Sequence, residues 1–230
     1  MSLIIHEFDS PDLLTQNLAK QIMTILQQAI KAKGKASLVV SGGSTPKPLF
    51  TLLSQTDFAW EKVTVTLADE RWVNATHKDS NEKLVRDNLL QGKASAATFV
   101  SLTTEDQDAT TAEPEISARI DAIDSQFDVL ILGMGEDGHT ASLFPCSEQI
   151  SAGLDMSRKL SAIATQPTTA PHQRMSMSLA KIVAAKKVFL HLTGAKKKAV
   201  LQDALANYTD LEKPIKAVCE HTTVDLMWAP

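Results

Sequence analysis

Short apolar runs alternate with longer segments of helical periodicity, and this alternation constrains the fold more than any other feature of the chain. Strands are predicted at residues 3–8, 36–40, 63–68, 129–132, 160–165, 174–179, 187–192 and 224–228. Helices are predicted at residues 11–33, 46–54, 80–90, 112–125 and 195–207. Alternation of this kind implies right-handed crossovers between strands. We therefore expect an α/β fold with a mostly parallel sheet and helices on both faces.

Composition and charge exclude several classes of protein. The 230 residues are 43% apolar and 22% charged, which is typical of neither a disordered chain nor a coiled coil. The net charge of −4 argues against a general nucleic-acid binder. Without an 18-residue apolar run or the bases of a signal peptide, we expect no membrane partner and a cytoplasmic location. Cys146 and Cys219 match no zinc or disulfide spacing and are expected to be reduced.

Ligands of such sheets bind at the carboxyl ends of the strands, so the residues that follow each strand are the candidates for function. The strand at 36–40 is followed by Ser41-Gly42-Gly43-Ser44-Thr45 and a proline. The glycines permit a sharp turn, and a helix N-terminus behind such a turn is a site for anions. An ordinary tight turn, with Ser44 or Thr45 as the helix cap, is an equally good interpretation.

The strand at 63–68 is followed by the charged residues Asp69, Glu70 and Arg71. Taken alone, these favour a solvated turn over a site. The strand at 174–179 opens with His172-Gln173-Arg174, whose basic groups would suit an anionic substrate, although the local sequence alone favours an edge turn. The four histidines at positions 6, 77, 191 and 221 have no partner pattern, and no role is assigned to them.

The buried strand at 129–132 is followed by a glycine-rich loop, residues 133–140. Its glycines match the dinucleotide fingerprint, but Pro145 leaves no room for the long helix that the fingerprint requires. The better interpretation is a loop that displays Asp137 and His139, a carboxylate able to orient a general base. The alternative is that Asp137 caps a following helix and His139 is incidental.

Three lysines, residues 196–198, open the helix that follows the strand at 187–192. Positive side chains oppose the helix dipole there, unless an anion occupies the N-terminus. At least one of them is therefore expected to bind phosphate, and a solvated lysine cluster is the alternative.

Six segments together, in this order, resemble the 6-phosphogluconolactonase family, within the wider group that includes glucosamine-6-phosphate isomerase/deaminase. They are SGGSTP (41–46), ADER (68–71), DSN (79–81), ILGMGEDGHTASLFP (131–145), PHQRMS (171–176) and LTGAKKKAVL (192–201). The fourth block is highly specific. The resemblance implies a Rossmann-like α/β fold and, with the chain length, a single domain over residues 1–230.

The resemblance also implies an activity: hydrolysis of 6-phospho-D-glucono-1,5-lactone to 6-phospho-D-gluconate, the second step of the oxidative pentose phosphate pathway. The partner is then a small sugar-phosphate lactone, and no cofactor is required. No metal is expected, because no set of ligand-type residues has metal-binding spacing. The chain is expected to be a monomer or small homo-oligomer.

Roles for individual residues follow from the same resemblance. His139 matches the family's catalytic histidine, and Asp137 stands at the partner position. Lys197 is chosen among the three lysines because family members show G-x-x-K after this strand. The positions that match substrate-binding groups are Ser41, Gly42, Gly43, Ser44, Thr45, Asp69, Arg71, Arg174 and Lys197.

Two alternative functions share this fold. The isomerase/deaminase branch carries a glutamate directly before the proline that ends the fourth block, where this chain has Phe144, and ring opening of an amino sugar would need that carboxylate. A non-catalytic sugar-phosphate-binding protein is the other alternative, and the intact Asp137/His139 pair argues against it. Residues 72–75 depart from the lactonase pattern, since many members carry a proline there.

Overall fold

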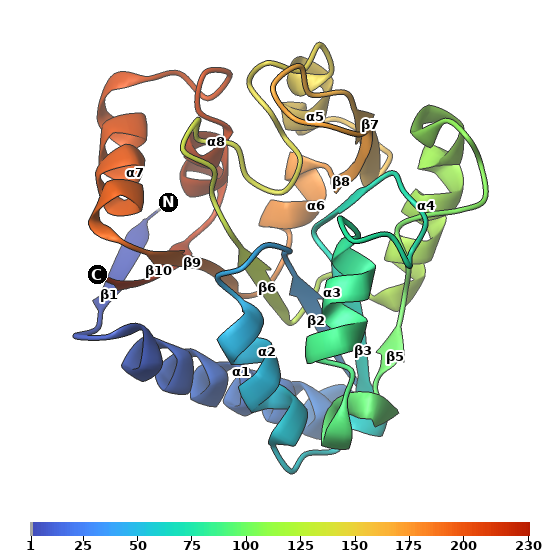
Figure 1. Ribbon diagram of the computed structural model, residues 1–230, viewed down its shortest axis with the longest axis vertical. Helices are drawn as coiled ribbons and strands as arrows, with labels where there is room; N and C mark the ends of the chain where they lie inside the picture. The colour runs from blue at the N-terminus through green and yellow to red at the C-terminus, as the bar shows by residue number, and fades with distance from the viewer. Residues whose placement is uncertain (1) are drawn as a thin grey trace.

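The computed structural model describes residues 2–230, and a seven-stranded sheet forms its centre (Figure 1). The strand order is β1-β10-β9-β6-β2-β3-β5, and every neighbouring pair is parallel, as the sequence predicts. The strands of this sheet are β1 (Leu3–Glu7), β2 (Ala36–Val40), β3 (Val63–Leu67), β5 (Thr98–Phe99), β6 (Val129–Leu132), β9 (Val188–Thr193) and β10 (Val224–Ala229).

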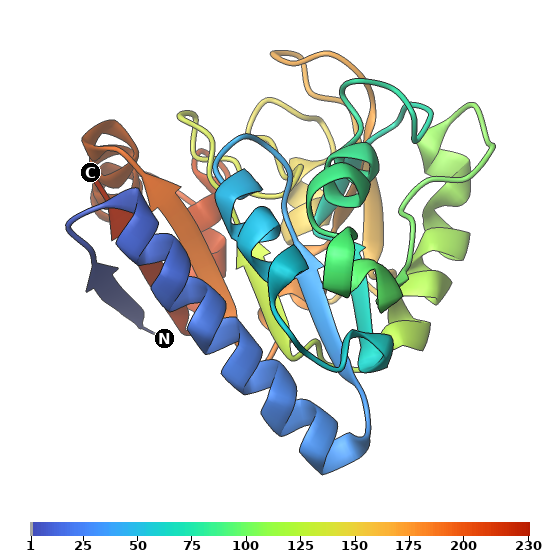
Figure 2. The same ribbon diagram turned by 60° about the horizontal axis from the view of Figure 1, so that its bottom comes forward.

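Helices cover both faces of this sheet, which confirms the predicted α/β architecture. They are α1 (Pro11–Lys33), α2 (Lys47–Gln55), α3 (Asn81–Asn88), α4 (Ala109–Ile123), α5 (Ile150–Leu154), α6 (Leu179–Val183), α7 (Ala195–Asn207) and α8 (Pro214–His221). Helices α1 and α2 lie below the sheet in Figure 1, and α7 and α8 lie above it. Figure 2 shows α1 crossing the sheet diagonally. Among residues 2–230, no helix has the length and apolarity needed to cross a membrane.

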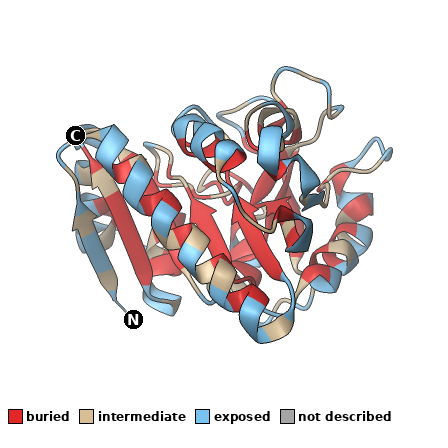
Figure 3. Ribbon diagram, turned by 90° about the horizontal axis from the view of Figure 1, so that it is seen from below, coloured by how far each residue is buried: buried red, intermediate tan, exposed pale blue. Residues whose placement is uncertain are grey.

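Local signals set the ends of α1, and burial of one face holds it in place. The Ser10 side chain accepts a hydrogen bond from the amide of Leu13, and Gly34 ends the helix with φ of 79°. The buried side chains recur at helical spacing and face the sheet; they are Leu14, Leu18, Ala19, Ile22, Leu26, Ala29 and Ile30. Figure 3 shows this two-sided pattern, with the central strands buried throughout and the outer side of α1 exposed.

A second, three-stranded antiparallel sheet has the order β4-β8-β7. It consists of β4 (Asp69–Arg71), β7 (Ala162–Thr165) and β8 (Arg174–Met177). The strands predicted at 160–165 and 174–179 therefore exist, but they pair with each other and with β4 outside the parallel sheet. The predicted solvated turn at 69–71 is wrong, because these residues form a strand and Glu70 is 1% exposed.

Two alternative interpretations that involve helix caps are excluded. No helix follows Gly138, because residues 139–145 form turns around an isolated bridge between Thr140 and Leu143. Asp137 therefore caps no helix, and the dinucleotide fingerprint is excluded for the same reason. Helix α2 begins at Lys47, and its N-cap is Pro46 without a side-chain hydrogen bond, so neither Ser44 nor Thr45 caps it.

Candidate active site

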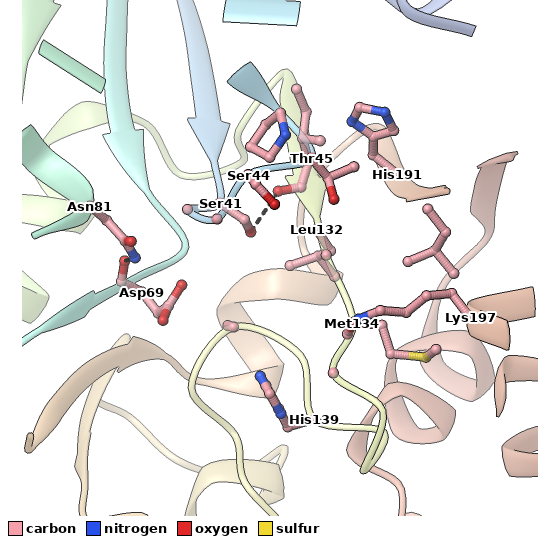
Figure 4. Close-up of a pocket in the computed structure, with 18 of the residues that line it drawn as sticks. Ser41, Ser44, Thr45, Asp69, Asn81, Leu132, Met134, His139, His191 and Lys197 are labelled. Carbon is pink, nitrogen blue, oxygen red and sulfur yellow. Dashed lines mark hydrogen bonds between the residues drawn. The ribbon is translucent and has the colours of Figure 1, made fainter. Parts of the chain in front are cut away.

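A cavity of about 490 Å³ opens at the carboxyl ends of β2, β3, β6 and β9, where the fold predicts a ligand site (Figure 4). Ten of the eleven predicted site residues line it, and the eleventh, Asp137, is bonded to one of them. The ten are Ser41, Gly42, Gly43, Ser44, Thr45, Asp69, Arg71, His139, Arg174 and Lys197.

The loop after β6 joins Asp137 to His139. The Nδ1 atom of His139 lies 2.6 Å from Oδ1 of Asp137, and the same oxygen accepts a hydrogen bond from the backbone amide of His139. Partial burial acts to raise the pKa of Asp137, but the hydrogen bond and charge of His139 outweigh it and hold this pKa below its usual value. The ionised carboxylate thus places the proton on Nδ1 and leaves Nε2 free as a base.

Close packing explains the glycine at position 135 in this loop. A Cβ atom on Gly135 would lie 2.2 Å from the imidazole of His139 and 2.5 Å from Oδ1 of Asp137. The ring of Phe144 stacks on the other side of the imidazole, with 4.0 Å between ring centroids and an angle of 27°. The His139 side chain is therefore held in one orientation by Asp137 and Phe144, on a loop that only glycine allows to pass so near.

The backbone of the Ser41–Thr45 loop also packs closely against a neighbouring side chain. A Cβ atom on Gly42 would lie 1.9 Å from Oδ1 of Asn81, and Gly43 has φ of 98°, which favours glycine. The hydroxyl of Ser41 donates to the carbonyl oxygen of Ile131 on the neighbouring strand, which ties this loop to β6. Figure 4 shows Ser44 and Thr45 in the part of the cavity away from His139.

The three residues of β4 have different roles: one caps a helix and two line the cavity. Glu70 accepts hydrogen bonds from the amides of Asn81 and Glu82 at the start of α3, at 2.7 and 2.6 Å, so its carboxylate is a structural cap. Burial raises the pKa of Glu70 despite these bonds. Asp69 and Arg71 line the cavity instead, and Asp69 accepts a 2.6 Å bond from the hydroxyl of Ser142.

Arg71 and Arg174 are direct partners in the pairing of β4 with β8. Both Nε atoms are buried and have no hydrogen-bond partner among residues 2–230. Burial, together with the neighbouring charge of Arg71, lowers the pKa of Arg174. Two adjacent guanidinium groups in the wall of the cavity make this wall suited to an anionic or oxygen-rich ligand.

Only one of the three lysines reaches the cavity. Lys197 lines it and donates from Nζ to the carbonyl oxygen of Met134. Lys196 pairs with Glu136, and Lys198 pairs with Glu7 and lies over the ring of Trp228. The position chosen by the G-x-x-K spacing is thus the one that faces the ligand site.

The comparisons with known proteins agree with this geometry. A family model described as "Glucosamine-6-phosphate isomerases/6-phosphogluconolactonase" matches residues 9–228. The chain belongs to this family. A 6-phosphogluconolactonase of Neisseria meningitidis serogroup A is 42% identical over 96% of this chain and 95% of its own length. One from Pseudomonas putida is 39% identical, covering 98% and 93%.

Solved structures of this family have the same fold. A 6-phosphogluconolactonase from Shewanella baltica OS155 superimposes with a TM-score of 0.96 at 43% identity, covering 100% of this chain and 98% of the other. A monomeric glucosamine-6-phosphate deaminase superimposes with a TM-score of 0.79 at 16% identity, covering 98% and 96%, which shows the fold alone. The parallel sheet with flanking helices is therefore the architecture of this family.

Sequence reasoning assigned no role to three residues of this family member's site. Asn81 packs against the Gly42 turn, Phe144 stacks on His139, and His191 lies in the cavity wall. His191 is 5% exposed, its Nδ1 atom has no partner among residues 2–230, and burial lowers its pKa to about 4. Figure 4 shows it in the part of the view away from His139. An imidazole within the apolar pattern of β9 carries no local signal of function.

Proposed function

We propose that this chain hydrolyses 6-phospho-D-glucono-1,5-lactone to 6-phospho-D-gluconate, with His139 as the general base. The observation that carries the proposal is the Asp137–His139 pair, at 2.6 Å, at the edge of a cavity whose other walls hold cations. Relatives named 6-phosphogluconolactonase, matched over nearly their whole length, support the choice of substrate.

In the proposed reaction, Nε2 of His139 takes a proton from a water molecule as its oxygen attacks the lactone carbonyl carbon. The tetrahedral intermediate then collapses, the bond from that carbon to the ring oxygen breaks, and the protonated imidazole returns the proton to the ring oxygen. Asp137 stabilises the imidazolium between these two steps. Proton transfer of this kind contributes about 10²–10⁴-fold to the rate, which suits a substrate that is already an activated ester.

The oxyanion of the intermediate needs hydrogen-bond donors. Two amides of the His139 loop already donate within the loop, since Gly135 bonds to the carbonyl of His139 and Gly138 to that of Gly135. Arg71, which lines the cavity, is therefore the better donor for the developing charge.

The opposite end of the cavity suits the phosphate group. The Ser41–Thr45 loop lines this end, away from His139 in Figure 4, and Lys197 lines the cavity as well. A phosphate held there fixes the distance from the anchoring charges to the reacting carbon, so that remote binding energy orients the lactone toward His139. The apolar ring of Phe144 occupies the position where the deaminase reaction needs a carboxylate, and it is 4% exposed.

The test is hydrolysis of freshly prepared lactone above its spontaneous rate, by the wild type and by His139→Asn. The variant is expected to lose about 10²–10⁴-fold in kcat and to retain binding of 6-phosphogluconate. The acidic limb of the pH–rate profile should disappear with it. Asp137→Asn should lose less, because the carboxylate acts only through its neighbour.

His221→Asn is a matched control. His221 stands at the end of α8, where its Nδ1 atom is hydrogen-bonded to the carbonyl oxygen of Ala217, and it does not line the cavity. A His139→Asn protein that folds, binds product and turns over at the wild-type rate would end the general-base proposal. Wild-type protein without any lactonase activity would end the substrate assignment.

A further inference from the structure

Three side chains with metal-ligand chemistry meet beside the cavity: His77 and Asp79 from the loop between β4 and α3, and His172 from the segment before β8. The Nε2 atom of His172 lies 3.0 Å from Oδ2 of Asp79, and Nδ1 of His77 lies 3.8 Å from the same oxygen. One ligand atom from each residue lies within 4.8 Å of the others. None of the three lines the cavity, so the cluster is separate from the proposed catalytic groups.

These spacings match the edges of a tetrahedral coordination sphere. With bonds of about 2.0–2.2 Å to Zn²⁺, neighbouring ligand atoms in a tetrahedron lie about 3.3–3.6 Å apart. The observed 3.0 and 3.8 Å fall on either side of that value, so small side-chain rotations suffice to enclose an ion. The three side chains are 28–40% exposed, which gives an ion access from solvent and leaves a fourth position for water.

The backbone holds His172 and Asp79 toward each other. His172 is one of two non-glycine residues between positions 2 and 230 with positive φ, at 69°. Such a conformation costs about 1–3 kcal/mol and persists only where its surroundings impose it. The carbonyl oxygen of Asp79 accepts a hydrogen bond from Arg71, which fixes that residue from the other side.

The protonation states also suit an ion. His77 accepts a 3.1 Å hydrogen bond from the amide of Asp79 at Nδ1, so this nitrogen carries a lone pair, and an ion would replace that one bond. Nitrogen and carboxylate ligands of this kind favour a borderline divalent ion such as Zn²⁺ or Co²⁺.

We propose that His77, Asp79 and His172 form a binding site for a divalent transition-metal ion, with water as the remaining ligand. The ion joins the loop after Arg71 to the segment before Arg174, so it ties together the two strands that carry the arginine pair. It also changes the local charge from about −1 to about +1 beside those arginines. The site takes no part in proton transfer, and its existence does not depend on the proposed lactonase activity.

The test uses the full chain, stripped with EDTA and titrated with Zn²⁺ by calorimetry and with Co²⁺ by visible absorption. The wild type should bind one ion at this site, show the intense bands of low-coordinate Co²⁺, and gain thermal stability as Zn²⁺ is added. His172→Gly removes a ligand and at the same time relieves the positive φ, so a loss of binding in it is not a failure to fold. It should bind at least about 10-fold more weakly.

Asp79→Asn should weaken binding as well, because it removes the charged carboxylate ligand. The backbone hydrogen bond from Arg71 to residue 79 is retained, so the loop should keep its position. His221→Gln is the control, since it removes an imidazole elsewhere and should bind as the wild type does. The proposal is wrong if His172→Gly binds Zn²⁺ as tightly as the wild type, or if binding is lost in His139→Asn instead. Turnover by the EDTA-stripped wild type at the normal rate is expected, and complete loss of turnover that Zn²⁺ restores would contradict a site outside the reacting centre.

Discussion

The buried imidazole of His191 makes the stability of this protein depend on pH in a calculable way. Burial lowers its pKa in the folded state to about 4, from 6.5 for a free side chain. Below pH 6.5, His191 binds a proton in the unfolded chain but stays neutral in the folded chain. The free energy of unfolding therefore falls as the pH falls. The pKa difference of about 2.5 corresponds to about 3 kcal/mol of stability, present above pH 6.5 and lost by pH 4.

This loss can be separated from the titration of carboxylates by comparison with His191→Gln. Urea unfolding of both proteins between pH 8 and 4.5 gives two curves, and their difference cancels the groups that they share. Between pH 7 and 4.5, the wild type should lose about 2 kcal/mol more than the variant. Parallel curves, or an NMR titration of His191 with an ordinary midpoint, would refute the inference that this ring is buried and neutral.

Three further predictions follow from contacts at or near the cavity. Lys197→Ala should raise KM for the phosphorylated lactone by about 10-fold or more in a steady-state assay, whereas Lys196→Ala, which removes only a surface pair with Glu136, should leave KM unchanged. Partial burial acts to raise the pKa of Cys146, but hydrogen bonds from Thr168 and Thr169 lower it to about 7, while burial raises the pKa of Cys219 to about 12. Iodoacetamide at pH 7.5 should therefore label Cys146 and spare Cys219 in the folded protein, as peptide mass analysis would show, and equal labelling would contradict this. Glu70→Gln should lower the free energy of unfolding by about 2–3 kcal/mol, because an amide nitrogen replaces one of the oxygens that accept the α3 amides; a urea midpoint equal to that of the wild type would contradict the capping role.

Strong periodicity made much of the parallel sheet predictable. The predicted strands at 36–40 and 129–132 and the predicted helix at 195–207 match the observed bounds. The loops after these strands converge in space because the carboxyl ends of parallel strands share one edge, so the sequence alone predicts which loops form the candidate site.

The errors in the two antiparallel regions share one physical cause, which is partners that lie far away in the sequence. Three adjacent charges at 69–71 indicate solvent exposure. In the fold, however, Glu70 accepts a hydrogen bond from the amide of Asn81, 11 residues later, and Asp69 accepts one from the hydroxyl of Ser142, 73 residues away. Alternation at 160–165 and 174–179 predicts strands without saying which strand each one pairs with. In the proposed metal site, His172 lies 93 residues from Asp79, and no local spacing could join these two.

The register of the small antiparallel sheet bears on how relatives of this chain can diverge. Arg71 and Arg174 face the cavity together because they are directly paired, and successive residues of a strand point to opposite faces. A single insertion within β8 would therefore turn Arg174 away and present an uncharged neighbour in its place. Insertions in the segment before β8 carry no such penalty. Lineages can thus change the length of the 166–173 loop, and gain or lose whatever it binds, while the arginine pair is inherited intact.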